Sequence, residues 1–153
     1  MPLKGLGKVK KAINVDIYNQ LNDEVSGVYF NGLAFVIRRT PVDTGRVRNN
    51  WFLTTREPSS KVRVGKNQGG GASFTQLKKI PKRVLGKRVY FTNNLPYIKT
   101  LEYGGYPNPV KLGSWDKKKK IYTKKSKNGF SIQAPNGFVR DQLKLMANEV
   151  RKL

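Results

Sequence analysis

Apolar side chains recur at three- and four-residue intervals early in the chain, and this pattern predicts a long α-helix over residues 15–39. The positions that carry the pattern are Ile17, Leu21, Val25, Val28, Leu33, Val36 and Ile37. Asn14 or Asp16 is expected to cap the first turn of this helix. Because Phe30 and Phe35 widen its apolar surface, we expect the helix to be substantially buried or packed against a neighbouring subunit.

Two further helical patterns lie in the second half of the chain. Pro96 opens a short helical turn that passes through Glu102 and is closed by Gly104 and Gly105, in the manner of a glycine cap. The last helix is expected to start at residues 135–136. Its apolar positions again repeat at three and four: Val139, Leu143, Met146, Val150 and Leu153.

Three segments predict short strands: residues 51–56 are rich in aromatic and β-branched types, and residues 61–64 and 87–93 show an alternating pattern. Between the second and the third, residues 65–73 include three consecutive glycines, which are costly in entropy to order. We therefore expect a mobile loop there. The loop contains Lys66 but lacks the Gly-Lys-Ser/Thr ending of a nucleotide-binding P-loop, so that function is rejected.

A projecting β-hairpin is predicted over residues 119–134. The alternating positions on its two arms are Ile121, Thr123, Phe130, Ile132 and Ala134. Asn128-Gly129 lies between the arms and is the strongest two-residue turn signal available. The lysines of residues 117–127 would then lie on one arm and at the tip of the hairpin.

Residues 40–51 predict a corner between the long helix and the first strand. Pro41 has no amide hydrogen and disfavours helix at the residue before it, so it ends the helix. Asp43 or Thr44 can then cap a new turn by accepting bonds from the free amides that follow. Trp51 is expected in the core, because it stands where the turn meets the strand.

The length of 153 residues predicts one domain, long enough to bury a core without disulfide bonds or a structural metal. Only 37% of the residues are hydrophobic, so a sizeable part is expected to be loop, arm or partner-facing surface. We expect residues 1–14 to form a basic N-terminal arm and residues 15–153 a single α+β domain. Cysteine and histidine are absent, which excludes a disulfide framework and thiolate chemistry. No apolar run approaches the roughly 20 residues that span a bilayer, and the N-terminus lacks the apolar core of a signal peptide.

Positive charge dominates the chain: 31 lysines and arginines against 9 acids give a net charge of +22. Self-repulsion of this size destabilises a compact monomer unless polyanions or partners offset it. Residues 61–88 carry nine basic residues and residues 117–127 carry seven, both without an acid, whereas residues 12–37 carry three acids and no base. A single lysine run usually marks a solvated loop, but two acid-free segments favour a surface that faces a polyanion.

The side chains expected to face a polyanion or a partner protein are Lys78, Lys79, Lys82, Arg83, Lys117, Lys118, Lys119, Lys120, Lys124, Lys125 and Lys127. No helix-turn-helix spacing or zinc finger accompanies them, so they support attraction to phosphates without base readout. Trp115 stands near four consecutive lysines. We expect it to pack near a polyanion or to pin the base of the hairpin.

We find no constellation for catalysis, for a metal or for a cofactor. Without His or Cys, general acid–base chemistry falls to nine carboxylates and seven tyrosines. Asp16, Asp23 and Glu24 share the first helix and the other acids occur singly, so none forms a Mg²⁺ cluster. Asp43 is better explained as a cap, and Glu102 as a helix-end or subunit contact. A basic nuclease built from Glu, Arg and Tyr is a distant alternative.

Three segments resemble one known family, the small neck and tail-completion proteins of tailed bacteriophages, which lie between the portal vertex and the tail. Residues 40–51 read Thr-Pro-Val-Asp-Thr-Gly-Arg-Val-Arg-Asn-Asn-Trp and are similar to the family's Pro-x-Asp-Thr-Gly-x-Leu-Arg pattern, with Val47 in place of the Leu. Residues 95–104 resemble its Tyr-Ala…hydrophobic-Glu-aromatic-Gly segment, although Ile98 stands where a small residue is common. Residues 133–138 are similar to its Pro-Phe-Leu entry to the C-terminal helix.

The resemblance assigns family-motif positions to Pro41, Asp43, Thr44, Gly45, Arg46, Trp51, Tyr97, Glu102 and Gly104. They would shape the subunit core and the contacts between subunits. The implied fold is α+β, with a small curved, mostly antiparallel sheet flanked by the long N-terminal helix and the C-terminal helix. Family members assemble as rings, commonly sixfold, at the head–tail junction or the tail end. Such rings help to join the tail to the filled head and surround the DNA channel.

On this resemblance the chain would be a structural virion protein of the neck or tail, assembled in the host cytoplasm, and not an enzyme. The expected partners are further copies of itself, neighbouring neck, portal-adaptor and tail proteins, and double-stranded DNA held without sequence readout. No membrane or cofactor is expected. The basic loop 61–88 and the basic hairpin 117–134 would line the channel or dock onto acidic faces of neighbouring ring proteins. The alternative is a free, sequence-nonspecific nucleic-acid-binding protein for DNA packaging or RNA binding.

Overall fold

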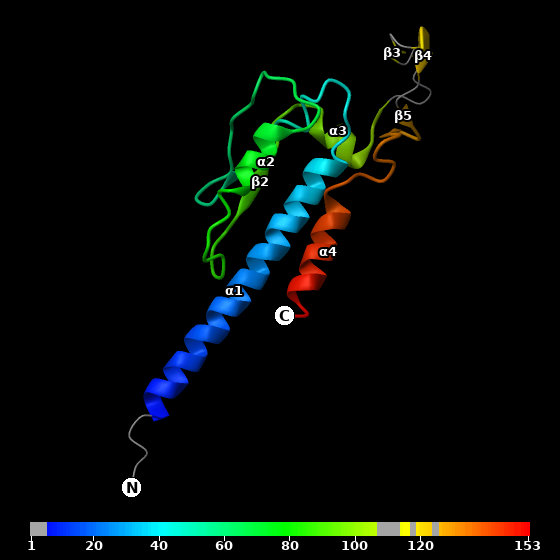
Figure 1. Cartoon of the computed structure of the whole chain (residues 1–153). Helices are drawn as coiled ribbons and strands as arrows, with labels where there is room; N and C mark the ends of the chain where they lie inside the picture. The colour runs from blue at the N-terminus through cyan, green and yellow to red at the C-terminus, as the bar shows by residue number, and fades with distance from the viewer. Residues whose placement is uncertain (1–5, 107–113, 117–118, 124–125) are drawn as a thin grey trace.

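The computed structural model describes residues 6–106, 114–116, 119–123 and 126–153. This part of the chain is an α+β arrangement of a long N-terminal helix, a C-terminal helix and short antiparallel strand pairs, which confirms the predicted class (Figure 1). The elements in chain order are α1 (Leu6–Arg39), β1 (Phe52–Thr54), α2 (Gly71–Leu77), β2 (Tyr90–Thr92), α3 (Ile98–Tyr103), β3 (Ser114–Asp116), β4 (Ile121–Thr123), β5 (Ser126–Lys127), β6 (Phe130–Ser131) and α4 (Arg140–Val150).

Helix α1 is longer than predicted, because it begins at Leu6 rather than at residue 15. Asn14 and Asp16 therefore lie inside the helix, and the prediction that one of them caps it is wrong. Residues 6–14, which were expected to form a basic arm, are the first turns of α1. Lysine and alanine in these turns are good helix formers, so the composition that suggested an arm also suits a helix.

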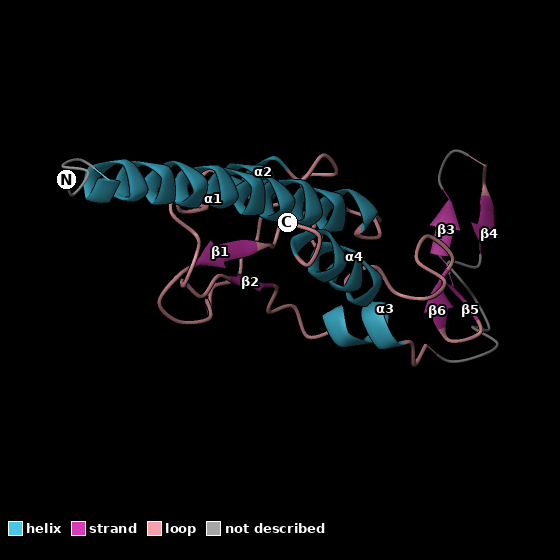
Figure 2. Ribbon diagram, turned by 90° about the horizontal axis from the view of Figure 1, so that it is seen from below, coloured by secondary structure: helices cyan, strands magenta, loops and turns pink. Residues whose placement is uncertain are grey.

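Helix α4 lies alongside the C-terminal half of α1 (Figures 1 and 2). At Gly32 the two helices come so close that a Cβ atom would lie 2.3 Å from the sulfur of Met146. The glycine in the middle of the predicted helix is therefore the place where α4 packs. Helix α4 begins at Arg140 and not at residues 135–136 as predicted, because the preceding turn is occupied with contacts to α3 that are described below.

One hydrophobic cluster joins α1 to the rest of the described chain. Its buried members are Leu33, Ala34, Val36, Ile37, Val47, Trp51, Leu53, Leu77, Leu95, Leu101, Ala134, Phe138 and Met146. Trp51 is 4% exposed, and its ring stacks on Phe91 with centroids 4.7 Å apart and meets Phe138 edge-on at 6.3 Å. The prediction that Trp51 is a core residue is confirmed.

Strands β1 and β2 pair antiparallel with Leu53 opposite Phe91, which confirms two of the predicted strands with shorter bounds. The predicted strand at residues 61–64 is wrong, because the structure has no strand there. Arg63 shows why: its backbone N–H and C=O bond to the side chain of Asn50, at 2.6 and 3.0 Å, instead of to a neighbouring strand. The guanidinium of Arg63 also lies over the ring of Phe52, 3.8 Å from its centroid.

The glycine-rich stretch was predicted to be a mobile loop. This prediction is wrong for the second part of the stretch, where helix α2 starts at Gly71. Side-chain contacts hold the start of this helix, among them a bond of 3.1 Å from the N–H of Ala72 to the side chain of Asn49. The side chain of Asn67 accepts a bond of 3.1 Å from the N–H of Gly70, and the buried hydroxyl of Ser73 accepts one of 3.0 Å from the N–H of Trp51. These contacts offset the entropy that the glycines lose on ordering. The contact between Ser73 and Trp51 joins residues 22 positions apart, so it cannot be read from a local pattern.

The region after α3 forms two short hairpins at one end of the molecule (Figure 2). Asn128 and Gly129 make the predicted turn, with φ of 51° and 78°, and connect β5 to β6. The expected pairing of residues 121–123 with the strand after the turn is wrong, since β4 pairs with β3 and places Ile121 opposite Asp116. Local alternation indicated the strands, but it did not determine which strands pair.

Candidate functional site

The corner of residues 40–51 joins α1 to β1 through buried polar groups. The hydroxyl of the fully buried Thr40 donates to the carbonyl of Val36 at 2.8 Å and accepts from the indole N–H of Trp51 at 3.0 Å. The indole ring therefore faces the core while its N–H is satisfied by the end of the helix. This pair fixes the direction in which the chain leaves α1.

Gly45 lies at the closest approach between this corner and the segment before α2. Its φ is +83°, and a Cβ there would lie 2.3 Å from the carbonyl carbon of Asn67 and from the amide nitrogen of Gln68. Both the backbone conformation and the contact require glycine. The glycine of the first segment that resembles the phage family is thus explained by packing of backbone on backbone.

A turn of residues 45–49 follows, and Thr44 caps it. The Thr44 hydroxyl accepts a long bond of 3.4 Å from the N–H of Arg46, and the N–H of Asn49 donates to the carbonyl of Gly45 at 3.1 Å. Asp43 or Thr44 was predicted to cap this turn, and the side chain of Thr44 makes the capping bond. The backbone carbonyl of Asp43 accepts a bond of 3.1 Å from the side chain of Gln68, which ties the same turn to the α2 side.

Arg48 holds this corner together, a role that was not predicted from the sequence. Its guanidinium donates to the carbonyl of Thr40 at 2.9 and 3.2 Å, to that of Arg38 at 2.7 Å and to that of Gln68 at 3.1 Å. The last carbonyls of a helix are unsatisfied and carry partial negative charge, so a cation here stabilises the end of α1. Burial lowers the pKa of the Arg48 guanidinium. The signal for it in the sequence is a second arginine two positions after Arg46, just beyond the end of the helix.

Glu102 caps the start of α4, which decides its role in favour of a helix-end contact within the subunit. The side chain is buried, and its oxygens accept bonds from the N–H groups of Phe138, Val139 and Arg140 at 2.8, 2.9 and 3.0 Å. The Nε of Arg140 adds a fourth bond of 3.0 Å. Burial on its own would raise the pKa of Glu102, but these donors outweigh it and hold the pKa below its ordinary value.

Gly137 lets the turn before α4 fit against α3. It has a φ of +85°, and a Cβ there would lie 2.5 Å from the carbonyl oxygen of Glu102. Helix α3 itself ends at Gly104, with φ of 81°, as predicted. Residues 95–104 and 133–138, the second and third segments of the resemblance, therefore meet in one joint.

The first segment reaches the same joint. Gln133 exchanges two hydrogen bonds of 2.8 Å with the backbone of Val42, and the ring of Trp51 meets that of Phe138. All three segments that resemble the phage family are thus in contact, although they are far apart in the sequence. Most hydrogen bonds of their side chains go to backbone groups, as expected of residues that stabilise the fold.

A cleft of about 550 Å³ lies between this corner, α3 and the β5–β6 hairpin. Its lining residues include Pro41, Asp43, Thr44, Gly45, Arg46, Lys66, Tyr97, Tyr106, Ser131 and Gln133. Within the part of the chain that the structure describes, the buried Nε of Arg46 has no hydrogen-bond partner. Burial, with a smaller contribution from Tyr97, raises the pKa of Tyr106, so its phenol stays a neutral hydrogen-bonding group. The cleft offers polar contacts rather than a nucleophile with a base beside it.

The described part of the chain contains no cluster of side chains that could bind a metal ion. Among residues 6–106, 114–116, 119–123 and 126–153, no group of three or more His, Cys, Asp or Glu side chains could hold a metal ion. Over the same ranges, none of the helices combines the length and the apolar composition that crossing a membrane requires.

The cations predicted to face a polyanion divide into two separate surfaces. Exposed side chains on the segment after α2 are Lys78, Lys79, Lys82 and Arg83. This segment is held beside the middle of α1, because the Asn22 side chain accepts a bond of 2.7 Å from the N–H of Val84 and donates to the carbonyl of Lys82. Asn22 is a buried polar residue inside the apolar pattern of α1, and a polar residue at such a position is the sequence signal for this anchor.

The second basic surface lies on the hairpins, beyond the C-terminal end of α1 (Figure 1). Its described members, all exposed, are Lys119, Lys120 and Lys127. Lys117, Lys118, Lys124 and Lys125 lie outside the described residues, and so does the side chain of Trp115. The described cations therefore do not form one continuous basic face.

The N-terminal half of α1 projects from the body as a further candidate surface (Figures 1 and 2). Every residue from 6 to 20 is exposed. Its large apolar side chains are between 44% and 58% exposed: Leu6, Val9, Ile13, Val15, Ile17 and Tyr18. Leu6, Val9, Ile13 and Ile17 share one face of the helix, whereas Val15 and Tyr18 line the groove on another side. An exposed apolar stripe of this kind marks an interaction site.

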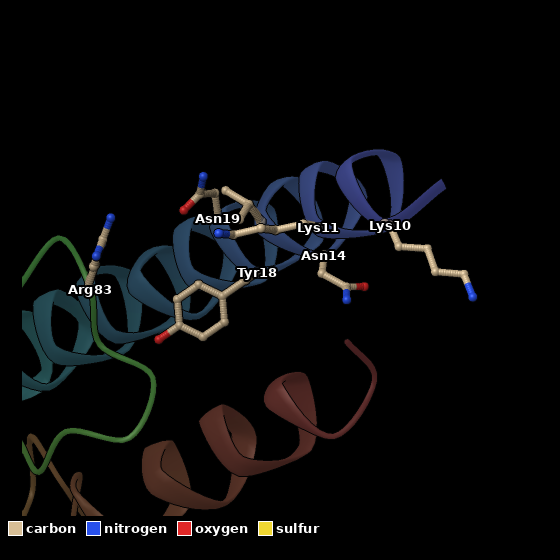
Figure 3. A pocket seen from close by; sticks show the side chains of 8 residues that line it. Lys10, Lys11, Asn14, Tyr18, Asn19 and Arg83 are labelled. Carbon is tan, nitrogen blue, oxygen red and sulfur yellow. The ribbon is translucent and has the colours of Figure 1, made fainter. Parts of the chain in front are cut away.

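A shallow groove of about 660 Å³ runs along one side of this half, between α1 and Arg83 (Figure 3). Lys10, Lys11 and Arg83 supply its positive charge, and no acid lines it. Asn14 and Tyr18 contribute an amide and a phenol to its wall. The groove therefore suits a partner that carries negative charge.

Comparison of the chain with family models, with curated proteins and with solved structures finds no match in any of the three.

Proposed function

We propose that the chain is a structural subunit of a tailed-bacteriophage virion, one copy of a ring, expected to be sixfold, at the head–tail junction or tail end. The ring completes or connects the tail around the DNA channel. The class of protein comes from the resemblance of three sequence segments to the neck and tail-completion family. The role in assembly comes from the surface of the subunit.

The observation that carries the proposal is the projecting half of α1. Residues 6–20 present an apolar stripe that no other described element covers (Figures 1 and 2). In a monomer these side chains stay in water, whereas a contact between subunits removes them from it. A subunit built to assemble accounts for such a helix better than an enzyme or a free binding protein does.

The architecture of the motif segments supports the same class. Gly45, Trp51 and Glu102 act through packing and through hydrogen bonds to backbone groups. None of them is directed at an open pocket with a reacting partner beside it. Residues of this kind keep a subunit rigid, which a ring under the pressure of packaged DNA requires.

The two separate basic surfaces also suit a ring subunit. A subunit in a stack meets DNA on one side and neighbouring proteins on others, and cations favour both kinds of contact. A lumen that bound DNA tightly with every lysine would oppose ejection. We therefore assign the channel to only one of the two surfaces.

Light scattering combined with negative-stain imaging of the purified protein tests the proposal. We expect a multimer, either alone or after addition of purified phage heads or tails, with a ring visible in projection. A strict monomer that never joins heads or tails would contradict it.

The second candidate is a free, sequence-nonspecific nucleic-acid-binding protein, favoured by the exposed Lys78, Lys79, Lys82 and Arg83. It predicts tight DNA binding with a steep salt slope, which falls by about one unit for each phosphate contact removed. Fluorescence anisotropy with the fourfold alanine variant of these residues measures that slope. A further set, Lys117, Lys118, Lys119 and Lys120, tests the hairpin in the same way. Absence of binding near physiological salt would remove this candidate.

A further inference from the structure

The acids of α1 lie on and beside its exposed apolar stripe. Residues 12–37 contain Asp16, Asp23 and Glu24 and no basic residue, so all 31 cations of the chain lie elsewhere. The three acids are exposed, and none makes a salt bridge within the described part of the chain. Asp16 and Asp23 are seven positions apart and therefore share one edge of the helix.

Helical spacing places these acids next to the apolar side chains. Ile13 and Ile17 are three positions before and one position after Asp16, respectively, and Val9 precedes Asp16 by seven. At about 100° per residue, Val9, Ile13 and Asp16 occupy neighbouring positions on one face. The exposed stripe thus has an acidic edge, formed by Asp16 and continued by Asp23, while Lys10, seven positions before Ile17, lies at its opposite edge.

The basic groove of Figure 3 lies on another side of the same helix. Ile13 and Tyr18 are five positions apart, which places the stripe and the groove roughly 140° apart around α1. One subunit therefore carries an acidic, apolar surface and a basic groove that point in different directions. The two cannot meet within one copy.

We propose that the acid-edged stripe of one copy docks into the basic groove of the next copy, where Lys10, Lys11 and Arg83 receive Asp16, Asp23 and Glu24. The occupant is a second copy of this chain, because charge and apolar character match across the contact and both surfaces are present on every copy. This inference rests on the proposed function, since it specifies the contact through which the subunits assemble.

A contact between two different surfaces has a consequence for symmetry. Head-to-tail contacts generate closed rings or open filaments, whereas a contact of one surface with itself gives dimers. A self-contact of the stripe would bring acid against acid, which costs free energy. The charge pattern of α1 therefore favours a ring over a dimer.

Charge reversal in two sets of variants tests the contact. The stripe variant carries Asp16→Lys, Asp23→Lys and Glu24→Lys, and the groove variant carries Lys10→Glu, Lys11→Glu and Arg83→Glu. A control variant reverses three exposed cations away from both surfaces, Arg56→Glu, Lys61→Glu and Lys99→Glu. Molar mass is measured by light scattering as a function of protein concentration, and circular dichroism verifies that each variant is folded.

We expect each reversed variant to need at least about tenfold more protein for half-complete assembly than the wild type, while the control assembles normally. An equimolar mixture of the stripe and groove variants should assemble again, because each then offers the charge that the other lacks. Neutral variants (Asp16→Asn, Asp23→Asn, Glu24→Gln) give the same direction with a smaller effect and replace any reversal that fails to fold.

A wild-type multimer whose assembly survives either reversal, or a mixture that does not recover, would overturn this contact and leave the ring proposal standing. A wild type that stays monomeric at every concentration and with every partner overturns the ring proposal itself.

Discussion

The two halves of α1 form one continuous helix but have different roles. Residues 21–39 pack against α2, α4 and the corner, and Ile37 is 0% exposed. Residues 6–20 contact no other described element closely enough to be buried, and Ile13 is 50% exposed. Both halves carry apolar residues at helical spacing. Periodicity therefore identifies a helix with an apolar face, and it does not say whether that face is covered by the same chain.

The comparison also separates the polar residues of the helix by role. Asn22, in the buried half, anchors a loop of its own subunit. Asp16, in the projecting half, makes no salt bridge in the described part of the chain. Asn22 thus stabilises the fold of its own subunit, whereas Asp16 stays at the exposed surface.

The largest effect is expected from a matched pair of isoleucines. Ile37→Ala should lower the free energy of unfolding by about 2–5 kcal/mol, because it empties buried volume in the core. Ile13→Ala should change it by less than about 0.5 kcal/mol, because the side chain already meets water in the monomer. Urea denaturation at concentrations low enough to keep the protein monomeric measures both. Equal costs would mean that the two halves do not differ.

A second pair compares a buried glutamate with an exposed one. Glu102→Gln should cost about 1.5–3 kcal/mol, because the charge-assisted bonds that fix the start of α4 to α3 are weakened. Glu24→Gln, on the exposed surface, should stay within about 0.5 kcal/mol. The same denaturation experiment applies. A Glu102→Gln variant as stable as the wild type would show that α4 does not depend on this cap.

Two glycines of α1 sharpen the comparison at the helix–helix contact. Gly32→Ala should cost about 1–3 kcal/mol, because its Cβ would overlap the side chain of Met146. In a Met146→Ala background this cost should shrink, since the two sites are coupled. Gly27 has nothing within 4 Å of its Cβ position, so Gly27→Ala should stabilise the helix by about 0.5–1 kcal/mol. The two substitutions are therefore expected to change the free energy of unfolding in opposite directions, and a double-mutant cycle measures the coupling with Met146. If both substitutions destabilise the protein equally, α4 does not pack at Gly32 as described.

The smallest effect is expected from pH. The folded-state pKa of Glu102 lies below its ordinary value of 4.5, so its contribution to stability is complete above that pH. The contribution is lost as the pH falls through the lowered folded-state value. The difference in unfolding free energy between wild type and Glu102→Gln should therefore narrow in acid. A difference that stays constant from neutral pH to pH 2 would contradict the assigned role.

Local patterns sufficed for much of the fold. Helix α3 with its Gly104 cap, strands β1 and β2, and the turn at Asn128-Gly129 each follow from residues close in the sequence. Helix α2 and the course of the chain around Arg63 could not be predicted in this way. Both depend on side chains that reach across the fold, from Asn50 and from Ser73.

The candidate surfaces show the same limit. The motif marked Glu102 and Gly45 as structural, but their partners, the α4 amides and the backbone of Asn67, are distant in the sequence. The basic segments were visible from composition alone. Their separation into two surfaces follows from the anchor at Asn22, and composition carries no such information.

Amide hydrogen exchange along α1 at low and high protein concentration tests the central claim most directly. We predict that protection of residues 6–20 rises with concentration as subunits cover the stripe, while protection of residues 21–39 is already high in the monomer and stays constant. Protection of residues 6–20 that does not depend on concentration, in the presence or absence of purified heads and tails, would contradict the assignment of this half to assembly.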